Sequence, residues 1–499
     1  MSFVDAMRNE TNKTKTTNGD EAFKSTLDSN IDVFMFAGAS RNDSNIKSKV
    51  LSAFPKALDE DFNMALRNLI NVRDFRIAGM GERDMFREMF LVLPMETQTK
   101  MLILIPTIGR WDDMVYVAQH TKYQTVSKLA YKIMSDVLNA DEIAAGKGEQ
   151  VSLLAKWLPS DKGSKTPQST KSLLKLLGFK SKRAYRHTLS AIRPSYNLVE
   201  TNLTERTYEK IELTKVPSRA FQKYKTAFYT YMPQKMEDLV SKVQAGEAVI
   251  KTAGVTPNEI LKSLISQEYS YGYNSVPSVP DSVIEAQWAS LPDLSEFGNT
   301  LVMADVSGSM SGQPMEVSVA LAIYFAEQMT GEFHNMFMTF AGNPEFVQLS
   351  DNMSLRQKVK ETVNANWDMS TNLEKAFQLI LNVAVKAQLP QDEIPETLVI
   401  ISDMQFNTAV RSNNSVFEST RAAFENAGYI MPNVVFWNVD GATTPVKADS
   451  NGVALVSGYS PAVMNAVTSG DLSEFTPTSI MTKQLMNPKY TELLELALL

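Results

Sequence analysis

The spacing of apolar residues divides the chain into two parts. From about residue 29 to 290, apolar residues recur three and four positions apart, as amphipathic helices require. The clearest such segments are 59–72, 83–92, 123–138 and 217–230. They are short and are separated by Pro, Gly, Ser and Asp. Many short helices in succession predict an α-solenoid of HEAT-like helical repeats, although no sharp repeat period is visible.

From about residue 299 the pattern changes to apolar runs that alternate with amphipathic helices. The predicted strands are Leu301–Val306, Met336–Phe340, Thr397–Ser402 and Val434–Val439. Helices are predicted on the face Val317, Ala320, Leu321, Tyr324 and Phe325, from Leu373 to Leu389, and from Ser415 to Ala427. Continuously apolar strands between helices predict a doubly wound, mainly parallel α/β sheet.

The domain boundaries follow from composition. Residues 1–28 contain little to bury and are expected to form a flexible tail. The helical domain is expected over 29–290, and the proline-containing stretch 271–298 should hold the connection. The α/β domain is expected over 291–499.

Bulk composition narrows the function classes. The net charge of −7 argues against a simple basic nucleic-acid binder, and the absence of cysteine excludes disulfides, Fe–S clusters and common structural zinc sites. No signal-like or membrane-spanning apolar run is visible, so we expect a cytoplasmic protein without a membrane partner. P-loop and G-x-S-x-G motifs are also missing, so we expect a protein that is not an enzyme.

Hydroxyl and carboxylate residues follow the predicted strands. Asp305, Ser307 and Ser309 follow the first, Asp403 follows the third, and Thr371 precedes a helix. Carboxyl ends of parallel strands meet at one sheet edge, so we expect these oxygens to converge. Such hard ligands suit Mg²⁺, with Mn²⁺ or Ca²⁺ as alternatives. Mostly neutral ligands would leave the ion able to accept a partner's carboxylate or phosphate. The simpler alternative is that these residues cap helices and turns.

This arrangement resembles the metal-ion-dependent adhesion site of von Willebrand factor A domains. Asp305, Ser307, Ser309, Thr371 and Asp403 match that motif one by one. The Ser370-Thr371-Asn372 loop departs from the Gly-rich form common in the family.

A helical-repeat region followed by an A domain is similar to the Ro autoantigen family, whose TROVE module forms a ring of helical repeats. The chain resembles more closely a Ro-like family of plants, fungi and phages, over roughly residues 40 to 499. The recurring strings are Gly109–Asp113, Ser152–Ser160, Val216–Ala220 and Val435–Asn438. In Ro proteins the ring binds ends of misfolded non-coding RNAs, and structured small RNAs bind its outer face. The resemblance therefore implies RNA binding.

The charge distribution independently favours RNA contact. Residues 147–235 hold 18 Lys and Arg against 6 Asp and Glu, a net charge of +12, so the rest of the chain carries −19. Tyr185, His187, Tyr196 and Tyr224 lie among these charges and could stack on bases. The alternative is a solvated helical face with core tyrosines. The densest basic run is Lys171, Lys175, Lys180, Lys182, Arg183 and Arg186.

Two functions remain open from the sequence. The first is a Ro-like ribonucleoprotein component that binds structured or misfolded non-coding RNA while its metal site recruits an anionic partner. The second is a metal-dependent protein-interaction scaffold without RNA, as a partner of an ATPase or of a phage–host complex. We expect a monomer, because a ring closed within one chain needs no second copy.

Overall fold

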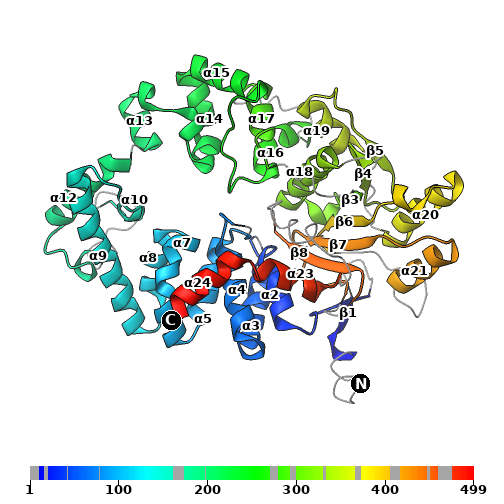
Figure 1. The fold of residues 1–499 in the computed structure, drawn as a ribbon, viewed down its shortest axis with the longest axis horizontal. Coiled ribbons are helices and arrows are strands. Elements are labelled where there is room, and N and C mark those ends of the chain that lie inside the picture. Colours follow the sequence, from blue (N-terminus) through cyan, green and yellow to red (C-terminus); the bar gives the residue numbers. More distant parts are fainter. Residues whose placement is uncertain are drawn as a thin grey trace.

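The computed structural model contains a helical array and an α/β domain (Figure 1). The structure describes residues 10–15, 21–41, 43–77, 79–160, 173–196, 198–269, 279–292, 299–329, 333–365, 372–404, 416–446, 450–458 and 475–498. Among the described helices, none has the length and apolarity that a membrane span requires.

The helical array runs from α2 to α17, and its helices follow one another around an arc (Figure 1). Polar side chains begin several of these helices: Asp61 accepts a hydrogen bond from the Met64 amide at α4, and Ser181 accepts one from the Ala184 amide at α12. The helices of the array are α2 (Ser29–Ala37), α3 (Ser44–Glu60), α4 (Phe62–Arg73), α5 (Arg83–Val92), α6 (Met95–Met101), α7 (Ile105–Ile108), α8 (Trp111–His120), α9 (Gln124–Lys147), α10 (Leu154–Trp157), α12 (Lys182–Ile192), α13 (Val199–Glu205), α14 (Ser218–Tyr231), α15 (Pro233–Gln244), α16 (Pro257–Tyr269) and α17 (Asp281–Trp288).

The α/β domain is built on a six-stranded sheet of order β5-β4-β3-β6-β7-β8. All neighbouring strands are parallel except β5, which pairs antiparallel with β4 at one edge. Every residue of β3 and β6 is buried, as in strands covered by helices on both faces. The strands are β3 (Thr300–Ala304), β4 (Met336–Thr339), β5 (Phe346–Gln348), β6 (Thr397–Ser402), β7 (Asn433–Asn438) and β8 (Val453–Ser457), and the helices are α18 (Gln313–Gln328), α19 (Leu355–Asn364), α20 (Leu373–Ala387), α21 (Val416–Asn426), α23 (Pro477–Leu485) and α24 (Pro488–Leu498).

The sheet therefore agrees with the predicted parallel α/β class and adds two strands to it. β5 is three residues long and only partly buried, so it gave no clear apolar run. β8 is fully buried and does carry a short apolar run, which the sequence analysis missed. The helix α18 also differs from the prediction of a single apolar face. Its residues from Val317 to Ala326 are all buried, because α18 lies between the sheet and α16.

Both ends of the helical array contact the α/β domain, so the chain closes into a ring (Figure 1). At one end, α2 packs against β8, and the last helix α24 packs on α4 and α6. At the other end, α16 packs on α18 and α19. A domain boundary at residue 291 thus separates the sheet from most of the array. It also assigns α24 to the α/β domain, although that helix packs against helices of the array.

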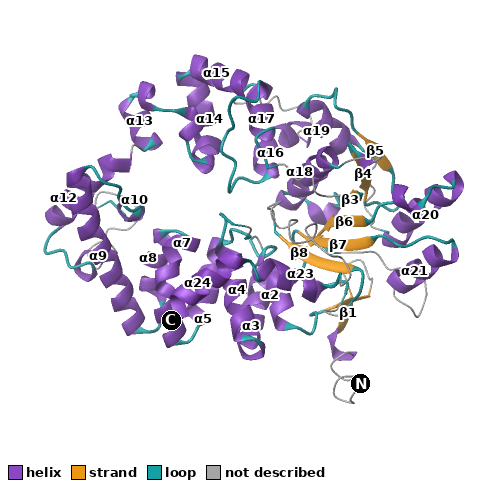
Figure 2. Cartoon of the chain, in the orientation of Figure 1, coloured by secondary structure: helices purple, strands orange, loops and turns teal. Residues whose placement is uncertain are grey.

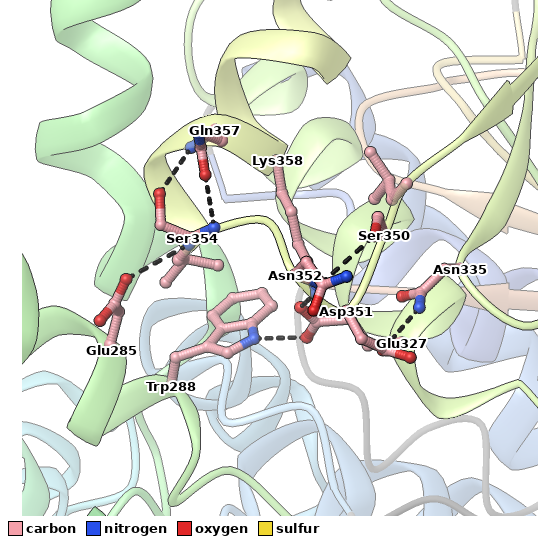
Figure 3. A network of polar contacts seen from close by, with 12 residues as sticks. Glu285, Trp288, Glu327, Asn335, Ser350, Asp351, Asn352, Ser354, Gln357 and Lys358 are labelled. Carbon is pink, nitrogen blue, oxygen red and sulfur yellow. Dashed lines mark hydrogen bonds and ion pairs between the residues drawn. The ribbon is translucent and has the colours of Figure 1, made fainter.

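A polar network fastens α17 to the α/β domain (Figure 3). The carboxylate of Glu327 on α18 accepts a hydrogen bond from the Trp288 indole at 2.6 Å and pairs with Lys358 of α19 at 2.7 Å. Arg356 of α19 pairs with Asp281 at the start of α17. These contacts fix the junction, because the Trp288 and Asp281 bonds each join helices from the two parts of the chain.

The segment 1–28 is not a tail throughout its described part. Strands β1 (Lys13–Lys15) and β2 (Glu21–Phe23) form an antiparallel pair, and the backbone of Phe23 exchanges two hydrogen bonds with Thr444. Thr26 also donates to the Asp32 carboxylate through its backbone amide at 2.7 Å. Composition alone does not reveal this order, because Thr444 and Asp32 lie outside the segment.

Candidate metal centre

Asp305 directly follows β3 and is fully buried. Its backbone amide continues the ladder by donating to the Ile401 carbonyl of β6 at 3.0 Å. Its carboxylate accepts two hydrogen bonds of 2.8 Å, to Oδ1 from the Ser307 amide and to Oδ2 from the Ser402 hydroxyl. The side chain is therefore held between the two central strands, where the direction of the sheet connections reverses. Open α/β sheets bind their ligands at this switch point.

The loop after β3 places two hydroxyls beside one another. Gly308–Met310 form a 3-10 turn, and the Ser307 and Ser309 hydroxyl oxygens lie 3.1 Å apart. Ser307 is buried and Ser309 is exposed. Pro314 then lies in the first turn of α18, as its fixed φ favours. The loop thus presents a hydroxyl pair that leads from the buried carboxylate toward solvent.

Asp403 directly follows β6 and is 4% exposed. Because β3 and β6 pair in register, Asp305 and Asp403 leave neighbouring strands at the same edge. Burial, and then the charge of Asp403, raise the pKa of Asp305 to about 7. The two buried carboxylates repel each other, and a bound cation would offset that repulsion.

A third carboxylate that the sequence analysis missed lies near Asp403. Asp440 comes two residues after β7, and its Oδ1 atom is buried without a hydrogen-bond partner among the described residues. Burial, and then the charges of Asp43 and Asp403, raise the pKa of Asp440 to about 6. The signal was available, since β7 is also an apolar strand followed by a carboxylate.

The fifth predicted ligand, Thr371, lies outside the described residues, which resume at Asn372. Asn372 caps α20 by accepting a hydrogen bond from the Lys375 amide at 2.9 Å. The Lys375 ammonium donates to the Gly342 carbonyl at 2.9 Å, shortly after β4. Helix α20 therefore begins at the carboxyl edge of the sheet, the edge that holds Asp305 and Asp403.

The residues present fit a hard divalent cation. The described residues hold no group of three or more His, Cys, Asp or Glu arranged to bind a metal, so a cation here would depend on hydroxyl ligands as well. Asp305, Ser307, Ser309 and Asp403 supply only oxygen donors, which suits Mg²⁺ better than softer ions.

The predicted basic run is exposed where it is described. Lys175, Lys180, Lys182, Arg183 and Arg186 are all exposed, and α12, which carries the last three, lies on the outer side of the arc (Figure 1). Lys171 lies outside the described residues.

The aromatic residues of this segment differ from one another. Tyr185 is fully buried and donates to the Pro159 carbonyl at 2.7 Å, so the expectation that it stacks on bases is wrong. The half-buried Tyr196 donates to the Ser152 carbonyl at 2.7 Å, which gives it a packing role as well. His187 has a side chain that is 81% exposed, and Tyr224 is half-buried. Residue type alone does not distinguish these cases, because both surfaces of a short helix can carry aromatic residues.

Two family models match the chain. Residues 162–299 match "Domain of unknown function (DUF2828)" and residues 299–486 match "Domain of unknown function (DUF7788)". The two matches meet at residue 299, directly before β3. The chain is also 29% identical over 513 residues to "Uncharacterized protein L728" of Acanthamoeba polyphaga mimivirus, an alignment that covers 93% of this chain and 86% of that protein.

Among solved structures, the chain is similar to the Ro (RSR) protein of Deinococcus radiodurans. The similarity covers 93% of this chain and 100% of that chain, with 13% sequence identity and a TM-score of 0.40.

Proposed function

We propose that the α/β domain is a von Willebrand A-type domain whose metal-ion-dependent adhesion site holds Mg²⁺, with Mn²⁺ or Ca²⁺ as alternatives. The observation that carries this proposal is the meeting of Asp305, Ser307 and Asp403 at the switch point of the sheet, with Asp305 bonded to both neighbouring segments. Ser309 completes the described donors. Thr371 is assigned from the sequence motif alone.

The chemistry of this site favours binding over catalysis. Hydroxyl ligands are neutral, so a divalent cation held by them supplies an open electrophilic position for a partner's carboxylate or phosphate. Asp305 orients the site through its bonds to Ser307 and Ser402. The proposed role is therefore metal-dependent attachment of an anionic partner, without an enzymatic step.

We further propose that the helical array binds RNA through the exposed basic run on and before α12. All five described members of the run are exposed, and they belong to the segment that carries a net charge of +12. Clustered exposed cations release counterions when they contact phosphates, which supplies most of the affinity for a nucleic-acid backbone. The chain would then hold structured or misfolded non-coding RNA on the array while its metal site recruits an anionic protein.

Mobility-shift titration of the full chain tests the RNA proposal. The probes are a structured RNA and an RNA with a single-stranded 3′ tail, each at several salt concentrations. Lys180→Ala/Arg183→Ala should weaken binding of both probes and lower the salt slope by roughly 0.9 for each lost phosphate contact. Lys360→Ala/Lys386→Ala removes the same charge from exposed positions of the α/β domain and should change little. Equal effects of the two pairs, or no binding by the wild type at low salt, would reject this proposal.

The second candidate is a metal-dependent protein scaffold without RNA. The metal site favours it, because strands and turns of the sheet bring the carboxylate and hydroxyl donors together. The described members of the basic run, by contrast, are exposed side chains that no such arrangement holds together. Affinity capture from nuclease-treated extract distinguishes the two. Partners retained with Mg²⁺, lost with EDTA and lost with Asp305→Asn support the scaffold even when no RNA is recovered.

A further inference from the structure

A cavity of about 460 Å³ lies inside the ring, where loops from opposite sides of the array approach each other. One wall is the loop between α4 and α5, and the other is the segment 254–259 at the start of α16. A Cβ atom added to Gly254 would lie 3.5 Å from Cδ2 of Phe75, so the two loops lie close together. Figure 2 shows both loops projecting into the interior of the ring. The volume lies in the range of small-molecule sites.

The lining of this cavity has an excess of positive charge. It contains six cationic residues and three carboxylates, and each carboxylate already pairs with one cation of the cavity. The pairs are Arg41–Glu82 at 2.5 Å, Arg83–Asp84 at 2.9 Å and Arg219–Glu259 at 2.5 Å, and the other cations are Lys47, Arg73 and Arg110.

Arg110 differs from the other cations of the cavity in its partners. Lys47 lies 3.7 Å from Glu88, and Arg73 is paired with Asp113 at 2.7 Å. Arg110 has no carboxylate within ion-pairing distance among the described residues. Its guanidinium instead lies over the Trp157 ring at 5.0 Å and the Phe75 ring at 5.6 Å.

The surroundings of Arg110 favour an anion. Burial and then the charge of Arg73 lower the pKa of Arg110, while the charges of Asp112 and Asp113 act against this shift and that of Arg219 adds to it. The guanidinium is a rigid fork of N–H donors that matches the oxygens of a phosphate or carboxylate. Three guanidiniums lie around the Phe75 ring, those of Arg73, Arg76 and Arg110, and of these Arg73 is already paired with Asp113.

The backbone of the cavity is fixed in advance. Asp74 accepts hydrogen bonds from the Arg76 amide at 2.9 Å and the Gly79 amide at 3.2 Å, and Tyr490 of α24 donates to the same carboxylate at 3.1 Å. The loop leads into α5, whose N-cap Glu82 makes no side-chain cap, and the first residues of that helix line the cavity. Uncapped amides at the N-terminus of a ten-residue helix add partial positive charge.

We propose that this cavity binds a phosphate monoester of mononucleotide size, with Arg110 and Arg219 as its main cationic partners. A monoester carries a charge of about −1.5 to −2 near neutral pH. It therefore attracts these two guanidiniums more strongly than the singly charged phosphodiester of an RNA strand does. This site is separate from the metal centre and from the basic run, so the proposal goes beyond the proposed function and does not depend on it.

Calorimetric titration of the full chain with adenosine 5′-monophosphate, inorganic phosphate and the dinucleotide ApA, which lacks a terminal phosphate, tests the site. The monophosphate and phosphate should bind, and ApA should not. Arg110→Ala should raise the Kd of the monophosphate about 10- to 100-fold, since charge-assisted hydrogen bonds are lost. Arg110→Lys keeps the charge without the fork and should lie between the two. Lys386→Ala removes an exposed cation of the α/β domain, outside both the cavity and the basic run, and should leave this Kd unchanged.

The Arg110 variants could lose binding because they misfold, so a second variant is needed. Arg219→Ala serves for this, because the Arg219 side chain is 54% exposed and its removal should not disturb folding. It should weaken the monophosphate by roughly 10-fold while the melting temperature stays the same. The proposal is overturned if the wild type binds neither phosphate nor the monophosphate at millimolar concentration. It is also overturned if ApA binds as tightly as the monophosphate, which would indicate a strand rather than a small ligand, or if Arg110→Ala and Arg219→Ala bind like the wild type. Loss of RNA binding in Lys180→Ala/Arg183→Ala has no bearing on any of these outcomes.

Discussion

Replacing the central carboxylate by an amide, Asp305→Asn, separates metal binding from folding. In the metal-free protein, the carbonyl oxygen of the new side-chain amide can still accept from the Ser307 amide, so that bond is kept. The Ser402 hydroxyl donates its one proton to Asp305 and accepts from the Met404 amide at 3.1 Å, so an NH₂ group facing it forces a rearrangement. That rearrangement costs about 1 kcal/mol. Removing one of two adjacent buried charges offsets it, because Asp403 no longer faces a like charge.

Without metal, the free energy of unfolding of the variant should therefore be at most about 1 kcal/mol below that of the wild type, or above it. With free Mg²⁺ at about one hundred times its Kd, binding stabilises the folded wild type by about 2.7 kcal/mol. The variant should lose most of this gain, since the ion loses a direct or bridging anionic ligand. The effect should appear only when metal is present.

Urea unfolding of both proteins in EDTA and in millimolar Mg²⁺ measures the difference. The matched control is Asp392→Asn, an exposed aspartate of the same domain, which should respond to Mg²⁺ like the wild type. The reasoning is refuted if Asp305→Asn gains as much from Mg²⁺ as the wild type does. It is equally refuted if Mg²⁺, Mn²⁺ and Ca²⁺ all leave the wild type unchanged.

Three further predictions concern stability. Glu327→Ala should destabilise the protein by about 3–5 kcal/mol in urea unfolding, because Lys358, whose side chain is 8% exposed, loses its partner in the junction; Glu327→Gln should cost less. Burial lowers the pKa of Lys225 to about 8, so the unfolded chain binds more protons between that pH and the ordinary lysine value of 10.5. Stability should rise across this window by roughly 3 kcal/mol in wild type relative to Lys225→Met, and a flat difference between the two proteins would contradict the assignment. Gly38→Ala should cost about 1–3 kcal/mol and loosen α2 from β8 in hydrogen exchange, because its Cβ would lie 2.6 Å from the Gly458 nitrogen.

Local sequence patterns predicted the α/β sheet well where they were strong. Thr397–Ser402 coincides with β6, and the other three predicted strands differ from the observed ones by one or two residues at one or both ends. A buried parallel strand needs only a short apolar run, and a Ser/Gly turn before Pro314 marks where the next helix begins. Weak patterns failed, as at β5, because an edge strand is only half-covered and carries no continuous apolar run.

Some residues of the candidate sites could be identified from the sequence, and others could not. The oxygens after β3 and β6 were identifiable, because parallel strands bring their carboxyl ends to one edge whatever the remaining packing. Asp440 followed the same pattern at β7 but lacked a recognised motif. Tyr185 was misassigned because burial depends on what packs against a helix, and α12, which carries it, packs on α9.

By itself, the sequence determined the alternation of helices and strands, the excess positive charge of 147–235, and the chemical type of the predicted metal ligands. These properties depend on neighbours a few positions away, so they can be read along the chain. Only the tertiary structure decided that α24 returns to α4, that Phe75 lies close to Gly254, and that Arg110 faces a cavity without a carboxylate partner among the described residues. Such contacts join segments far apart in the chain, and they follow from how whole helices pack rather than from any local pattern.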